Sequence, residues 1–101
     1  CAGDFSVVQT MLADSATVMG LGDAGAHVGV ICDAAGPTYL LQHWARDRTR
    51  GPRLPLEMLV KKQTLDTARV YGLTDRGVLA PGYLADLNVI DFFDLSTQVR
   101  L

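Results

Sequence analysis

The stretch ATVMGLGDAGAH, residues 16–27, decides the fold that this sequence predicts. Its first half, residues 16–21, is a continuous apolar run that follows the polar pair Asp14-Ser15. A short run of this kind is typical of a strand covered on both faces, as in a parallel sheet flanked by helices. The second half is rich in Gly, Asp and Ala, which favours a loop. The sequence therefore predicts a buried parallel strand that ends in a glycine-rich loop carrying Asp23.

Helical patterns lie on both sides of the predicted strand. Apolar residues recur at helical spacing behind Asp4, a candidate N-cap, which predicts a short amphipathic helix over residues 5 to 13. Pro37 can occupy the first turn of a second helix, which Gly51 and Pro52 end. That helix is expected to turn five side chains inward: Tyr39, Leu40, Leu41, Trp44 and Ala45.

The C-terminal half begins with helix and changes to strand. A third helix is predicted after Pro55, with Thr64 as an internal cap that opens a further turn and Gly72 as its end. Beyond Asp75 the pattern becomes that of strands, and Pro81-Gly82 is the signature of a type II turn in a hairpin. The predicted order is helix, strand, helices and hairpin.

Composition and charge narrow the class of protein. The 101 residues are 49% hydrophobic and 20% charged with a net charge of -2, which is typical of one small globular domain. This balance gives the molecule no electrostatic reason to bind nucleic acid or an acidic membrane surface. No apolar run approaches the roughly 18 residues of a membrane span. Cys1 and Cys32 make no disulfide framework, which predicts a cytoplasmic protein.

Two local patterns suggest other ligands. Six of the nine basic residues lie between Arg46 and Lys62, and such a cluster could bind phosphate. Its alternation with Asp47 and Thr49 near a helix end instead favours a solvated face. Residues 20–25 match the GxGxxG spacing of dinucleotide-binding loops, but no second strand with an acidic end follows at roughly 20 residues.

Two longer stretches resemble amidohydrolases of the D-aminoacylase-like group, the N-acyl-D-amino-acid deacylases. The last barrel strand and following loop of those enzymes are similar to MGLGDAGAHVGVICDAAGPTYLLQHWARDR, residues 19–48. Their closing segment, where the chain leaves the barrel, is similar to TLDTARVYGLTDRGVLAPGYLADLNVID, residues 64–91. The ADLNVID ending is shared across much of the amidohydrolase superfamily, whereas GDAGAH followed by WARDR favours the D-aminoacylase-like branch.

The resemblance implies a fold and a site. The fold is α/β: the C-terminal fragment of a (β/α)8 TIM barrel over residues 1–76, then a hairpin of a small β-sandwich domain over residues 77–101. Asp23 would end the eighth strand, move the proton of a metal-bound water and also contact the metal, which is zinc in the complete enzyme. His27 is assigned to substrate binding near the mouth of the site. The other ligands of the family lie on earlier barrel strands, so the fragment is expected to bind no metal and to be inactive alone.

The residues themselves do not predict an independent zinc site. The candidate ligands show none of the CxxC, HxH or HExxH spacings, and they are Asp23, His27, Cys32, Asp33 and His43. His43 is expected to be a packing or surface residue, and Cys32 a small buried hydrophobe.

The predicted function is hydrolysis of the carbon-nitrogen bond of N-acyl amino acids or related small amides by a metal-activated water. The chain is expected to need the missing N-terminal barrel portion as its partner. Two alternatives stay open: a structural or interaction module that homo-oligomerises, and a nucleotide- or phosphate-binding unit that uses the loop at residues 20–25. The sequence does not determine the acyl group, the amine, the stereochemical preference or the metal count.

Overall fold

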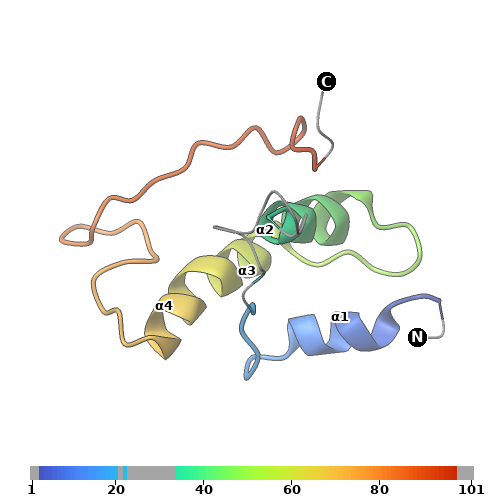
Figure 1. Cartoon of the computed structure of the whole chain (residues 1–101), viewed down its shortest axis with the longest axis horizontal. Helices are drawn as coiled ribbons and strands as arrows, with labels where there is room; N and C mark the ends of the chain where they lie inside the picture. The colour runs from blue at the N-terminus through green and yellow to red at the C-terminus, as the bar shows by residue number, and fades with distance from the viewer. Residues whose placement is uncertain (1–2, 21, 23–33, 98–101) are drawn as a thin grey trace.

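The computed structural model describes residues 3–20, 22 and 34–97. Within them the helices are α1 (Ser6–Ala13), α2 (Gly36–Tyr39), α3 (Leu56–Lys61) and α4 (Thr67–Val70). Two π-helical stretches, η1 (Leu40–Asp47) and η2 (Lys62–Asp66), continue α2 and α3. Figure 1 shows α2 with η1 as one rod and α3, η2 and α4 as a second, with α1 beside them. No helix of the described residues is long and apolar enough to cross a membrane.

The first predicted helix is confirmed as α1, with a shifted cap. Asp4 Oδ1 accepts hydrogen bonds from the backbone N–H and the hydroxyl of Ser6, each at 2.9 Å. The N-cap position itself belongs to Phe5, which has the left-handed φ of 56°. The prediction of Asp4 as the N-cap is therefore wrong: Asp4 precedes the N-cap Phe5 and binds the first residue of the helix from there.

The second predicted helix is confirmed as α2 and η1, and Pro37 lies in its first turn. Its predicted end at Gly51-Pro52 is wrong, because η1 ends at Asp47 and Arg48 is already extended. Three of the five side chains predicted to point inward are buried: Leu40, Leu41 and Trp44. The prediction is wrong for Tyr39, which is 47% exposed. Its ring stacks on that of His43, with the centroids 5.1 Å apart, so it covers the helix surface instead of entering the core.

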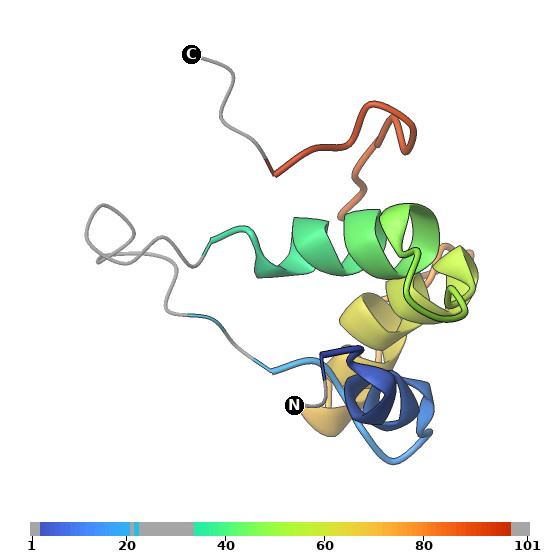
Figure 2. The ribbon, with the colours of Figure 1, turned by 90° about the vertical axis from the view of Figure 1, so that its right-hand side faces the viewer.

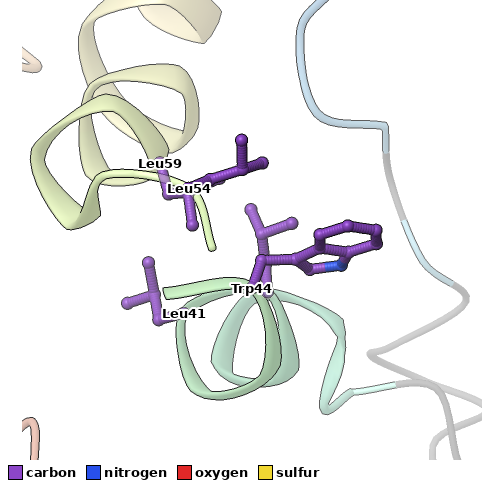
Figure 3. Close-up of a cluster of buried hydrophobic side chains, with 5 residues drawn as sticks. Leu41, Trp44, Leu54 and Leu59 are labelled. Carbon is purple, nitrogen blue, oxygen red and sulfur yellow. The ribbon is translucent and has the colours of Figure 1, made fainter. Parts of the chain in front are cut away.

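The core lies where the two rods meet (Figure 3). Its buried side chains are Leu40, Leu41 and Trp44 of η1, Leu54 of the connecting loop and Leu59 of α3. The backbone N–H of Leu54 donates to the Trp44 carbonyl at 2.8 Å, so the loop folds back along η1. Each fully buried leucine contributes about 2 kcal/mol of hydrophobic stabilisation. Four leucines and one tryptophan make a small core.

The third helix is confirmed as α3, but its continuation differs from the prediction. Thr64 is not an internal cap, because the chain stays helical through it within η2. Its hydroxyl donates to the carbonyl of Val60 at 2.8 Å, one turn back. Gly72 does end the rod, with φ of 73° and its N–H donating to Arg69 O at 3.0 Å.

The segments predicted as strands lie outside the helices. Residues 16–20 pair with no strand within the part of the chain that the structure describes. The type II turn at Pro81-Gly82 is confirmed, because Tyr83 N–H donates to Ala80 O at 3.2 Å and Gly82 has φ of 85°. No ladder flanks this turn within residues 77–97, which run extended around the helices (Figure 1). The barrel, the sandwich and their boundary after residue 76 stay predictions.

Candidate functional site

The predicted catalytic and metal-binding residue Asp23, and the predicted substrate-binding residue His27, lie outside the described residues. Cys32 and Asp33 do as well. The described chain leads towards them in sequence through residues 14–20, which leave the end of α1. Residues 14–20 are called here the approach segment. The structure describes the contacts of this segment but not those of the predicted site residues themselves.

Lys62 holds the approach segment through its ammonium group. Its side chain comes from the first residue of η2 and is 3% exposed. Nζ donates to the Asp14 carbonyl at 2.5 Å, to the Thr17 carbonyl at 2.7 Å and to the Thr17 hydroxyl at 3.2 Å. An ammonium has three N–H donors, so every one of them has an acceptor here.

The acceptors of Lys62 belong to a tight turn that ends α1. Asp14 Oδ1 accepts from Ala16 N–H at 2.8 Å, and Thr17 N–H donates to Asp14 O at 3.3 Å. The Thr17 hydroxyl donates to the Met11 carbonyl at 2.6 Å. The last carbonyls of a helix carry partial negative charge, so a cation is stabilised beside them.

The basic cluster between Arg46 and Lys62 is only partly the solvated face that the sequence predicted. Arg50, Arg53 and Lys61 are exposed, whereas Arg48 and Lys62 are buried. Arg46 binds the chain's own backbone. Arg46 Nη1 donates to the carbonyls of Phe92 at 2.6 Å and Phe93 at 3.0 Å, and its Nη2 donates to Leu95 O at 2.7 Å. These bonds fasten the C-terminal segment to η1. Figure 2 shows that segment passing along the rod made by α2 and η1.

Asp47 orients the group that makes these bonds. Its carboxylate accepts from Arg46 Nε at 2.7 Å and from Gln42 Nε2 at 3.1 Å. Hydrogen bonds from Arg46, and then from Gln42, lower the pKa of Asp47 from 3.8 to about 2. Gln42 Oε1 in turn accepts from Thr97 N–H at 3.0 Å. The three side chains thus form one backbone-binding unit, called here the η1 clamp: Gln42, Arg46 and Asp47.

Arg48 fastens the N-terminal end of the chain. Its guanidinium lies 4.4 Å above the Trp44 ring and is 3% exposed. Nη2 donates to Asp4 O at 3.1 Å and to Arg50 O at 3.2 Å. Nη1 is buried and has no hydrogen-bond partner among the described residues. A phosphate-binding face would leave the guanidinium groups of Arg46 and Arg48 accessible. Here they bind backbone carbonyls of the chain itself.

The described residues offer no metal centre. They contain no group of three His, Cys, Asp or Glu side chains that could hold a metal ion. His43 lies between two rings, stacked on Tyr39 and 5.3 Å edge-on from Trp44, which agrees with its predicted packing role. The donor set that the resemblance implies for zinc therefore does not occur in this part of the chain.

Sequence comparison gives the family. A profile of the Amidohydrolase family matches residues 3–100, nearly the whole chain. This chain belongs to the amidohydrolase family. The family match confirms the broad resemblance predicted from residues 19–48 and 64–91, and it does not extend to the D-aminoacylase-like group.

Named relatives of this amidohydrolase chain are deaminases. Adenine deaminase of Desulfitobacterium hafniense is 50% identical over 38 residues, which are 38% of this chain and 7% of that protein. Adenine deaminase of Lysinibacillus sphaericus is 55% identical over 39 residues, 39% of this chain and 6% of that protein. A 5-methylthioadenosine/S-adenosylhomocysteine deaminase of D. hafniense is 54% identical over 39 residues, which are 39% of this chain and 9% of that protein.

The chain thus spans less than a tenth of the length of these relatives. No solved structure matches it.

The Lys62 contact was missed by the sequence prediction, although one signal for it exists. Lys62 follows the fully buried Leu59 by three residues, which places both on one face of a helix. Its neighbour Lys61 lies on another face and pairs with Asp66 at 2.6 Å. A lysine on an apolar stripe is a candidate for a buried, hydrogen-bonded cation.

Proposed function

We propose that this chain is the C-terminal part of an amidohydrolase that uses water to cleave a carbon-nitrogen bond, and that it is catalytically incomplete. The observation that carries the proposal is the family match over residues 3–100. The second half is supported by the resemblance, which implies that the other metal ligands lie on earlier barrel strands. The small share of each relative that the chain spans supports it too.

For the reaction, we propose Asp23 as the proton-transfer residue. A carboxylate that accepts a proton from the attacking water can return it to the leaving nitrogen, and this kind of catalysis contributes about 10²- to 10⁴-fold. The support is sequence position: Asp23 follows the apolar run of residues 16–21, whose described part, residues 16–20, is not helical. His27 is proposed to contact the substrate. Zinc, when bound in the whole enzyme, would polarise the water, and most of its ligands would come from other parts of the polypeptide.

The substrate class has two candidates. Hydrolysis of N-acyl amino acids or related amides is favoured by the GDAGAH and WARDR stretches, and it would release a carboxylate and an amine. Deamination of an aminopurine is favoured by the names of the relatives, and it would release ammonia. Both reactions add water to a carbon that carries nitrogen. The proposed proton transfer by Asp23 would therefore be the same in either reaction.

The test uses the full-length polypeptide that contains this sequence. N-acyl-D- and N-acyl-L-amino acids, adenine and 5-methylthioadenosine would be supplied in turn, with primary amine and ammonia measured separately. Asp23→Asn should lower kcat by about 100-fold or more, with the circular dichroism spectrum unchanged. Asp86→Asn, a change at an exposed position, is the matched control. Near-normal turnover by Asp23→Asn removes Asp23 from the mechanism.

The 101-residue chain alone gives a second prediction. It should retain no stoichiometric zinc after loading and dialysis, because a zinc site needs three or four fixed ligands. Elemental analysis of the dialysed chain measures this directly. One tightly held zinc per chain would contradict the proposed incompleteness.

A further inference from the structure

We propose that the C-terminal part of this chain exchanges between two copies, so that residues 92–97 of each copy occupy the η1 clamp of the other. Residues 92–97 are called here the anchor segment, and residues 85–91 the connector. The inference concerns how copies of the chain associate. It does not depend on the proposed function, because none of these residues belongs to the predicted site.

The anchor segment is held mainly through its backbone. Arg46 directs all five of its N–H donors at acceptors, two on Asp47 and three on backbone carbonyls of the anchor segment. Gln42 Oε1 accepts from Thr97 N–H at 3.0 Å, and Leu95 packs against the core cluster. A surface that fits a segment of its own chain fits the same segment of an identical copy equally well, which is the basis of domain swapping.

The anchor segment begins with a turn that is closed by local hydrogen bonds. Asp91 Oδ1 accepts from Phe93 N–H at 3.1 Å and from Asp94 N–H at 3.3 Å. The turn presents the carbonyls of Phe92 and Phe93 to the same nitrogen of Arg46. Because its closing bonds lie within the segment, the turn keeps its shape when the segment moves from one clamp to another.

The connector, in contrast, is exposed throughout. Every residue from 85 to 91 is exposed, and Leu87 and Val89 are 63% and 104% exposed. The chain just before it is tied locally, since Leu84 N–H donates to Asp75 O at 2.7 Å. Roughly seven extended residues span about 23 Å, which is enough to reach the clamp of a copy packed directly against the first. Exchange therefore needs a new path for the connector alone.

The connector also favours exchange over the closed chain. It pairs with no strand within the part of the chain that the structure describes, and its apolar side chains include Leu87, Val89 and Ile90. In an exchanged pair the two connectors run past each other in opposite directions, where their backbone groups can pair and these side chains can pack. Exchange keeps the contacts of both clamps and adds this pairing.

Light scattering on the 101-residue chain measures the association. A dimer should form as the concentration rises towards about 1 mM, because a second copy competes with an anchor segment held on a short linker at about that effective concentration. Arg46→Met should raise the Kd of the dimer about 10-fold or more, since it removes charge-assisted bonds to the anchor segment. Arg69→Met is the matched control, because Arg69 lies exposed on α4, and its dimer should match that of the wild type.

Isotope-filtered nuclear Overhauser spectra show whose anchor segment fills each clamp. Equal amounts of carbon-13-labelled and unlabelled wild-type chain are unfolded in urea and refolded together at a concentration where the dimer dominates. The Phe92 ring lies 5.8 Å from the Arg46 guanidinium carbon. Contacts between these two side chains should join a labelled chain to an unlabelled one. This measurement needs no variant, so it decides the question even if Arg46→Met does not fold.

Three results would overturn the exchange. The first is a wild-type chain that stays monomeric up to about 1 mM. The second is a dimer that Arg46→Met retains or strengthens, because a segment freed from the clamp would then associate through its exposed apolar side chains alone. The third is a dimer in which the contacts between Phe92 and Arg46 occur only within one chain.

Discussion

At the scale of single residues, Gly77 occupies a position that only glycine fits. Its φ of 88° lies in the left-handed region, and a Cβ built on it would lie 2.8 Å from Leu65 Cα and 3.0 Å from Leu65 N. Real Cβ atoms do not approach backbone atoms this closely, so the chain after α4 can lie against η2 only with glycine here. Gly82 has a similar φ of 85°, but a Cβ added there would meet no atom within 4 Å.

These two glycines make a matched pair for a stability test. Gly77→Ala should lower the free energy of unfolding by about 2 kcal/mol or more, since it adds a steric clash to a strained φ. Gly82→Ala should cost only about 1 kcal/mol, the conformational part. Urea denaturation of both variants measures the difference. Equal losses would show that the contact of Gly77 with η2 does not contribute.

At the scale of elements, the π-helical turns decide which side chains meet. Gln42 bonds to Asp47 and Lys61 bonds to Asp66, and both pairs are five residues apart. The Thr67 hydroxyl likewise donates to Lys62 O at 2.8 Å. Sequence patterns assume the α-helical spacing of three and four residues. For this reason the sequence predicted the positions of the rods but not the η1 clamp.

The η1 clamp predicts that the stability of the fold depends on pH. The pKa of Asp47 is lowered to about 2, chiefly by hydrogen bonds from Arg46, whereas the unfolded carboxyl titrates near 3.8. A depressed folded pKa contributes stability that is complete above about pH 4 and is lost as the pH falls towards 2. Asp47→Asn lacks this contribution. The urea midpoint of the wild type should therefore exceed that of Asp47→Asn at pH 6, and the gap should narrow between pH 4 and pH 2.

Measurement of both proteins across this pH range isolates Asp47 from the other carboxylates. Asp4 and Asp75 also have lowered pKa values, from hydrogen bonds with Ser6 and Arg76, but they occur in both proteins. A gap that stays constant from pH 6 to pH 2 would show that the clamp carboxylate does not stabilise the fold.

At the scale of the whole molecule, the chain exposes more surface than a closed domain. Its accessible area is 7733 Å², against about 5600 Å² for a folded monomer of 10.9 kDa. The radius of gyration is 14.8 Å, against about 13 Å for a domain of this length. The extended C-terminal segment carries several exposed apolar residues, which include Val78, Leu79, Leu84, Leu87, Val89, Ile90 and Phe93.

This excess surface agrees with the proposed incomplete enzyme. An extended segment with apolar side chains on both faces is what a strand lacking its neighbours would leave exposed. The open alternative, a module that homo-oligomerises, would cover the same surface. The activity test on the full-length polypeptide distinguishes the two, because a purely structural module would show no turnover in any longer polypeptide.

The sequence alone determined the helices, the type II turn and the family, because these depend on local spacing, on Pro and Gly geometry and on motifs that lie within short stretches. Apolar periodicity also placed Leu40, Leu41 and Trp44 on an inward face. Only the tertiary structure decided what the cations bind. Lys62 meets Thr17, and Arg46 meets Phe92, across 45 and 46 positions, and their acceptors are backbone carbonyls that every residue carries. Because a carbonyl has no residue type, no sequence pattern can mark it as a partner.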